Sequence, residues 1–233
     1  MILTNRLFER NPPSREAKSI YIFCEGAKRE FDYFEYFKEL DSRINIEVYK
    51  LYPHENNSPS GLLRIAEKCI IKTNKNPNPK YNFIDGDEVW IVLDIDKDKD
   101  VSREPQILSV QERCDETENW YLAQSNPCFE VWLYYHLHSN KPNFNNSENC
   151  SEWKQLVNST VKGGFDSRRH PIYIETASTN AEKNFKSHNE KPDIGSTEIY
   201  NLANTIVHLV SSKLKLVLKV INEQYKNTHN SLN

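Results

Sequence analysis

The chain has 233 residues and a mass of 27.4 kDa, and its 30 basic and 33 acidic side chains give a formal net charge of −3. This length can bury a hydrophobic core, and a mean hydropathy of −0.75 argues against a membrane protein. The near-neutral charge excludes a general polycation, so nucleic-acid binding would need a local basic face. The first residues, MILTNRLFER, lack the apolar core of a signal peptide, and we expect a cytoplasmic protein without membrane contact.

The five cysteines form no Cys-x-x-Cys pair and are odd in number, which disfavours a zinc ribbon or a complete disulfide framework. We therefore expect reduced thiols, several of them buried in the core. These cysteines are Cys24, Cys69, Cys114, Cys128 and Cys150.

A polar arm over residues 1–17 leads into a first half in which apolar, strand-forming segments alternate with segments of helical periodicity. Phe31, Phe34 and Phe37 recur every three residues and mark one face of a helix. The segment VWIVLD is almost continuously apolar, as in a strand buried on both faces of a parallel sheet. We expect strands at 19–24, 45–51, 89–94 and 120–123, and helices at 27–40, 61–72, 105–114 and 129–137.

The last third is predicted to be mostly helical, with helices at 153–161, 177–187 and 197–224. The last helix carries an apolar stripe that suits packing within the chain or a seam in a homo-oligomer, and the sequence leaves both open. The alternation of strands and helices predicts an α/β fold: a parallel sheet of about four strands flanked by helices, with a mostly helical C-terminal part. The expected parts are an arm (1–17), an α/β core (18–139) and a helical region packing on the core (140–233).

Two carboxylates end the most apolar strand of the chain, in the segment VLDIDKD. Asp94 and Asp96 are two residues apart, so in extended backbone they project to the same side at the carboxyl end of the strand. Sites form at this edge of open parallel sheets, and adjacent carboxylates ionise together only when a cation lies between them. The spacing therefore indicates a site for Mg²⁺, with a solvated acidic turn as the alternative.

A second acidic residue follows the first predicted strand, in Cys24-Glu25-Gly26. Gly26 permits a tight turn into the next helix. If the first and third strands are neighbours, Glu25 faces Asp94 and Asp96 across the edge of the sheet. Two independent strand ends then converge on one place, which is a stronger signal than either motif alone.

A Glu-Gly turn after the first strand and an Asp-x-Asp after the third resemble the Toprim pattern of topoisomerases, primases and OLD nucleases. More closely, the segments IFCEGAKREFDYF, VWIVLDIDKD and SNPCFEVWLYYHL resemble motifs of RloB-like proteins, in the same order. The resemblance covers about residues 18–210. Arg29 stands where the pattern usually has Thr. A looser match near the C-terminal end involves Ala177, Asn180, Lys183, Gly195, Ser196 and Thr197.

This resemblance implies a Toprim-like fold with a divalent-metal site, and a bacterial antiviral role in abortive-infection or restriction-linked loci. It also implies a partner ATPase of the ABC or AAA type. By analogy with related Toprim proteins, the expected activity is metal-dependent cleavage of nucleic acid, either DNA or tRNA. No phosphate-binding loop of the GxxxxGK[ST] kind is present in the sequence, so a required ATPase would be another chain.

On this reading Glu25, Asp94 and Asp96 hold Mg²⁺ or Mn²⁺. Glu30 lies five residues beyond Glu25, so it supports a second metal or is a surface residue of its helix. Glu130 stands in an otherwise apolar helical segment, where an unpaired carboxylate would be costly to bury. It therefore has either a catalytic, metal-linked role or a structural partner.

A nuclease also needs a cation near the reacting phosphate. Lys183 is the first candidate, because its position resembles that of the late lysine of Toprim nucleases. Arg168 and Arg169 follow Gly163-Gly164 and form a local basic cluster that is the second candidate for substrate phosphate. The alternative for all three is a solvated basic surface.

Several polar side chains near these motifs are assigned structural roles. We expect Ser125 or Asn126 to cap the helix that starts at Pro127. Tyr134 and Tyr135 could suggest a topoisomerase-type nucleophile, but their place in an apolar helix favours packing in the core.

Two other functions remain open from the sequence. The chain could be a non-catalytic Toprim-like sensor or scaffold that binds an ATPase or a phage protein, because Arg29 departs from the pattern. It could also carry out small-molecule phosphoryl transfer on the same carboxylates, because no base-reading motif is present in the sequence.

Overall fold

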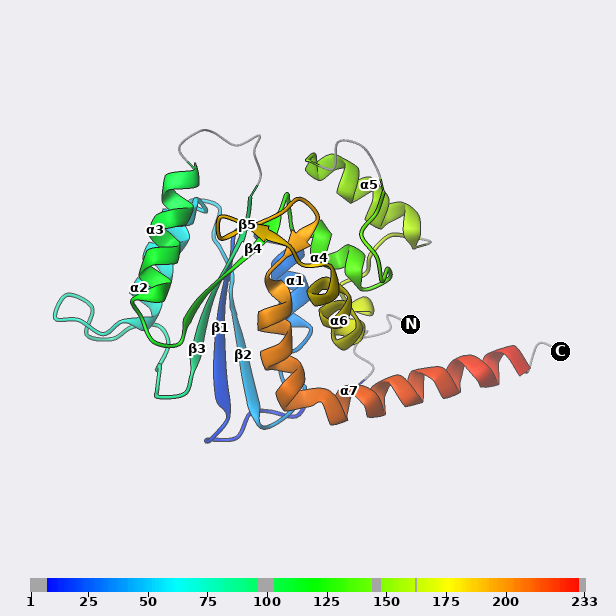
Figure 1. Cartoon of the computed structure of the whole chain (residues 1–233). Helices are drawn as coiled ribbons and strands as arrows, with labels where there is room; N and C mark the ends of the chain where they lie inside the picture. Colours follow the sequence, from blue (N-terminus) through cyan, green and yellow to red (C-terminus); the bar gives the residue numbers. More distant parts are fainter. Residues whose placement is uncertain (1–7, 96–102, 144–147, 162, 231–233) are drawn as a thin grey trace.

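The computed structural model describes residues 8–95, 103–143, 148–161 and 163–230 (Figure 1). Asp96, which the sequence analysis places among the metal ligands, lies outside the described residues. Within the described part, no helix is both long enough and apolar enough to cross a bilayer.

A five-stranded sheet forms the centre of the fold, in the order β2-β1-β3-β4-β7. The first four strands are parallel, as the sequence predicts; they are β1 (Lys18–Cys24), β2 (Ile44–Tyr49), β3 (Glu88–Asp94) and β4 (Trp120–Asn126). The fifth strand, β7 (Ser196–Thr197), pairs antiparallel with the end of β4 and was not expected. It has only two residues, which is too short for a periodic pattern to reveal.

Helices cover both faces of the sheet and make three layers (Figure 1). The alternation of side chains along β1 explains the layers, because Ile20 and Ile22 enter one hydrophobic cluster whereas Tyr21 and Phe23 enter the other. The second cluster is closed by α2 (Pro59–Ile70) and α3 (Arg103–Asp115). The first is closed by α1 (Arg29–Glu35), α4 (Glu130–Tyr135), α6 (Ile174–Asn184) and α7 (Ile199–Asn230).

The C-terminal helices share the core of the first half. Ala177, Ile206 and Val210 lie in the same hydrophobic cluster as the strand residues Ile20 and Ile22. Figure 1 shows the last part of α7 extending away from the sheet. The remaining elements are α5 (Cys150–Thr160), the short 3₁₀ helix η1 (His170–Tyr173) and a hairpin of β5 (Ser187–His188) and β6 (Lys191–Pro192).

The expected capping role of Ser125 and Asn126 is wrong. Both residues belong to β4, which runs three residues further than the sequence suggests. The Ser125 hydroxyl hydrogen-bonds the Thr197 hydroxyl at 2.7 Å, and Asn126 Nδ2 donates to the Pro192 carbonyl oxygen at 2.7 Å. Their side chains therefore fasten β7 and the hairpin to the sheet, and the N-cap of α4 has no side-chain hydrogen bond.

Two predictions about the core are confirmed. Tyr134 and Tyr135 are buried, and the Tyr135 hydroxyl donates to the Gly195 carbonyl oxygen at 2.7 Å. All five cysteines are free, and four of them are buried. The exception is Cys150, which is partly exposed.

Candidate active site

The parallel pairing of β1 and β3 brings two of the predicted site residues together. Cys24 lies opposite Val92 in this register, so both strands end at the same edge of the sheet. The Glu25 amide donates to the Val92 carbonyl oxygen at 3.2 Å, and the Asp94 amide lies 3.5 Å from Glu25 Oε2. The first and third strands are neighbours, which meets the condition set by the sequence analysis, and Glu25 faces the end of β3.

Glu30 joins this edge from the first turn of α1. Its side chain is buried and lies over the β1–α1 turn. A Cβ atom on Gly26 would overlap the Glu30 carboxyl group, so a larger residue at this point would displace the end of the Glu30 side chain. Gly26 therefore lets the Glu30 carboxyl group lie close to the turn.

Glu130 reaches the same region as the first residue of α4. It is buried, with a side chain only 5 % exposed, and it forms an ion pair with Arg29. The Arg29 Nη1 to Glu130 Oε1 distance is 2.6 Å, and the Arg29 side chain is 38 % exposed. The carboxylate that the sequence marks as too costly to bury alone thus has a cationic partner.

A second arginine holds Glu25. Arg103, the first residue of α3, forms an ion pair with Glu25 through Nη2. The same Nη2 donates to the Asp94 carbonyl oxygen at 2.7 Å, and Nε donates to that oxygen at 3.2 Å. Because the Arg103 and Glu25 side chains are only 11 % and 8 % exposed, this ion pair is largely shielded from solvent.

Neither arginine was recognised as a site residue from the sequence. Arg29 was noted only as a departure from a motif, and Arg103 follows the acidic turn without any motif of its own. Each pairs with a carboxylate that is distant in the chain. The only sequence signal that Arg29 belongs to the site is its position three residues after Gly26.

The four carboxylates Glu25, Glu30, Asp94 and Glu130 influence one another electrostatically. Burial raises the pKa of Glu30 to about 7, and the negative charges of Glu130 and Glu25 add to this shift. Burial also raises the pKa of Asp94 well above its usual value, with further contributions from Glu30, Glu25 and Glu130. These shifts favour the protonated forms of Glu30 and Asp94, while Glu25 and Glu130 are each paired with an arginine. We call these four residues the carboxylate cluster.

The chemistry of the carboxylate cluster suits a hard divalent cation, because Mg²⁺ and Mn²⁺ prefer oxygen ligands and would stabilise the ionised forms of these carboxyl groups. As the side chains stand, no three His, Cys, Asp or Glu residues of the described part are arranged to hold a metal ion. Two of the four carboxylates are engaged by arginines. Metal binding would therefore require these ion pairs to open.

The structure places the other predicted cations elsewhere. Lys183 is exposed in the last turn of α6, and its Nζ lies 3.4 Å from Asn140 Oδ1. Arg168 Nε contacts Asp166 Oδ1 at 2.9 Å, and Arg169 Nε lies 3.8 Å from Asp166 Oδ2. No contact recorded among the described residues joins these three cations to the carboxylate cluster.

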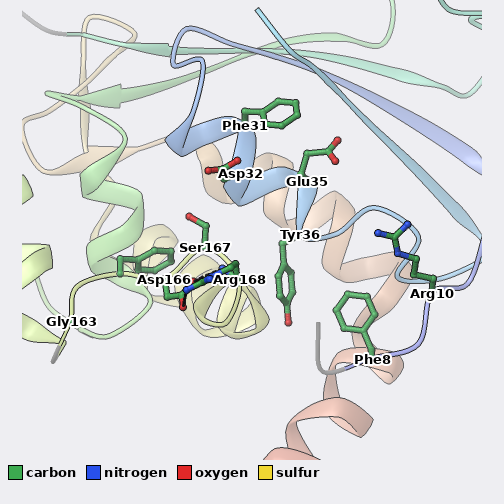
Figure 2. Close-up of a pocket in the computed structure, with 11 residues that line it drawn as sticks. Phe8, Arg10, Phe31, Asp32, Glu35, Tyr36, Gly163, Asp166, Ser167 and Arg168 are labelled. Carbon is green, nitrogen blue, oxygen red and sulfur yellow. Dashed lines mark hydrogen bonds and ion pairs between the residues drawn. The ribbon is translucent and has the colours of Figure 1, made fainter. Parts of the chain in front are cut away.

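Arg168 instead lines a pocket of about 900 Å³ on the outer side of α1 (Figure 2). Figure 2 shows Asp32 and Glu35 of α1 and the following Tyr36 on one side of the pocket, with Asp166 and Arg168 on the other. No member of the carboxylate cluster is among its lining residues. Arg168 therefore belongs to a different surface from the cluster.

The fold and this edge define an α/β protein with a carboxylate-rich site at the carboxyl end of a parallel sheet. Residues 20–209 match the family of RloB-like proteins, and the chain belongs to that family. The matched range begins in β1, ends within α7 and includes all four members of the carboxylate cluster. No curated protein and no solved structure matches the chain.

Proposed function

We propose that this chain is a metal-dependent nuclease with a Toprim-like site, acting as an effector of bacterial anti-phage defence together with a partner ATPase. The observation that carries the proposal is the convergence of Glu25, Glu30, Asp94 and Glu130 at one sheet edge. Such a concentration of carboxyl groups with raised pKa values is unfavourable for the fold alone, and it is typical of sites that bind cations and act on phosphates. Family membership supports the defence role and the ATPase by resemblance.

In this proposal Glu25, Asp94 and Asp96 hold Mg²⁺ or Mn²⁺, and Glu30 supports a second ion. When bound, the metal supplies an activated water and offsets negative charge on the phosphodiester. Glu130 lies close enough to Glu30 to raise its pKa, so it tunes the charge of the site. Lys183 stays a candidate phosphate ligand only if the substrate extends across the surface to α6.

The test is cleavage by a variant with both Asp94→Asn and Asp96→Asn. We expect it to lose Mn²⁺-dependent cleavage by at least 100-fold, because a carboxylate-to-amide change removes the anionic ligands and keeps the shape. Asp115→Asn is the matched control, since Asp115 ends α3 on the surface and accepts a hydrogen bond only from Gln111 among the described residues. Plasmid DNA, total tRNA and nucleotides serve as parallel substrates, and turnover of nucleotides alone would favour small-molecule phosphoryl transfer. A double variant as active as wild type would refute the mechanism.

The defence role is tested in cells. The chain is expressed with and without the proposed partner ATPase, and phage plating is compared between wild type and the Asp94→Asn, Asp96→Asn variant. We expect protection that requires both the ATPase and intact carboxylates. Protection that is unchanged in the variant would mean that the chain acts without cleavage.

A non-catalytic scaffold is the second candidate, and one observation favours it. Both Glu25 and Glu130 are already neutralised by arginines, as in a site that has no need of a metal. Calorimetric titration with Mn²⁺ distinguishes the two functions. The absence of binding at millimolar metal would favour the scaffold.

A further inference from the structure

The carboxylate cluster is closed by two guanidinium groups, from Arg29 and Arg103. We propose that these arginines compete with the divalent cation for Glu130 and Glu25, and that, once displaced, they bind the substrate phosphate. The inference deepens the proposed function, on which it rests. It assigns the phosphate-binding role to these two arginines instead of to Lys183 or the pair at 168–169.

Arg29 has the geometry of a displaceable partner. Its guanidinium holds Glu130 at 2.6 Å, while more than a third of its side chain is exposed. The Glu130 carboxylate is buried, so it needs a cation, but the arginine can turn outward without breaking the core. If a metal ion took over the charge of the cluster, Arg29 would be released at the edge of the site.

Arg103 has two kinds of partner, and only one of them competes with a metal. Its ion pair with Glu25 would be lost when Glu25 binds a cation. Its hydrogen bonds to the backbone carbonyl oxygen of Asp94, at 2.7 and 3.2 Å, do not involve the Asp94 side-chain carboxyl group. These bonds would keep the guanidinium at the end of β3 after Glu25 has left it.

The chemistry of the released groups points to phosphate. Guanidinium groups bind phosphate oxygens through paired N–H donors, and they do so most strongly where water is partly excluded. The other basic candidates have partners elsewhere, because Arg168 is held by Asp166 and Lys183 lies beside Asn140. Arg29 and Arg103 are thus the cations that the described structure puts in direct contact with the cluster.

Competition of this kind couples the two ligands of the site. An anion that draws Arg29 and Arg103 away from Glu130 and Glu25 frees carboxylates for the metal, and the metal in turn frees the arginines for the anion. By thermodynamic linkage each ligand must then strengthen the binding of the other by the same factor. The site would remain closed until metal and phosphate are both present.

The experiment measures Mn²⁺ affinity by calorimetry, with sodium sulfate as the phosphate probe against sodium chloride at equal ionic strength. Arg29→Thr removes one competitor, and Arg29→Lys keeps the charge but loses the fork of N–H donors. Lys28→Gln is the matched control. It removes one positive charge from the neighbouring residue, which is exposed and has no ion pair among the described residues.

We expect Arg29→Thr to bind Mn²⁺ roughly threefold to tenfold more tightly than wild type, and more tightly than Lys28→Gln, because a half-exposed ion pair no longer opposes the metal. Arg29→Lys should fall between wild type and Arg29→Thr. Sulfate should tighten Mn²⁺ binding in wild type and have a clearly smaller effect in Arg29→Thr. Thermal unfolding checks that each variant is folded.

Two results would overturn the inference. If Arg29→Thr and Lys28→Gln change Mn²⁺ affinity equally, the arginine acts only through its general charge. If sulfate leaves the Mn²⁺ affinity of wild type unchanged, the two ligands are not coupled. Either result with cleavage intact would leave the proposed nuclease standing, whereas the absence of any Mn²⁺ binding in wild type would refute both.

Discussion

Replacing Glu30 by Gln tests directly whether the carboxylate cluster is held at a cost to the fold. The side chain is buried beside Glu25 and Glu130, and its pKa is raised from 4.5 to about 7. Because the folded state binds this proton more tightly than the unfolded state, the free energy of unfolding should fall as pH rises from about 4.5 to about 7. Above pH 7 the Glu30 carboxylate is charged in both the folded and the unfolded state, so the full loss of stability remains.

The size of the effect on stability follows from the shift in the pKa of Glu30. A change from 4.5 to about 7 corresponds to on the order of 3 kcal/mol of lost stability above neutrality. Glutamine has nearly the same shape and no charge, so Glu30→Gln should be more stable than wild type at pH 8 by about 2–3 kcal/mol. For a chain of this length that is a rise in Tm of roughly 5–10 °C. At pH 4.5 the two proteins should differ little.

The assay is urea unfolding followed by circular dichroism at pH 4.5, 6 and 8, with EDTA present to remove metal. Glu198→Gln is the control, because burial raises the pKa of Glu198 to about 7 as well, while its carboxylate accepts a hydrogen bond from the Gln124 amide outside the cluster. Added Mn²⁺ should raise the Tm of wild type and Glu198→Gln, and raise that of Glu30→Gln less. Equal stability of wild type and Glu30→Gln at pH 8 would refute the reasoning.

Three further variants probe the surroundings of the cluster. Gly26→Ala should displace the Glu30 carboxyl group and lower the stability in urea by about 1 kcal/mol or less; a loss of several kcal/mol would mean that this group cannot move. Tyr135→Phe should lose about 1 kcal/mol with the bond to Gly195, and no loss would mean that this bond adds nothing. Lys183→Gln should leave Mn²⁺ affinity by calorimetry unchanged, whereas tighter binding would place the lysine charge beside the site.

Much of the fold could be read from periodicity. The alternation of strand-forming and helical segments and the continuous apolar run of β3 predicted the parallel sheet, because strands buried on both faces are mostly apolar. The end of the fourth strand does not follow from periodicity, because β4 runs on to Asn126 through residues whose polar side chains suggest a helix cap. Those side chains are satisfied by β7 and the β5–β6 hairpin, far along the chain, which no local pattern reveals.

The carboxylate cluster also separates what the sequence reveals from what only the fold reveals. Strand ends can be located from short sequence patterns. The sequence therefore predicted that Glu25 and Asp94 would meet if the two strands were neighbours, and β1 does pair with β3. Glu30 and Glu130 were named as candidates, with their partners left open. The ion pairs of Arg29 with Glu130 and of Arg103 with Glu25 join residues 101 and 78 positions apart.

The sequence by itself therefore determined the class of fold, the edge of the sheet where acidic residues gather, and the family. Only the tertiary structure decided which cations serve those acids, how deeply Glu30 is buried, and that Lys183, Arg168 and Arg169 contact other groups. The physical reason is that strand and helix patterns depend on near neighbours in the chain, whereas burial and charge pairing depend on residues that meet only when the helices pack against the sheet.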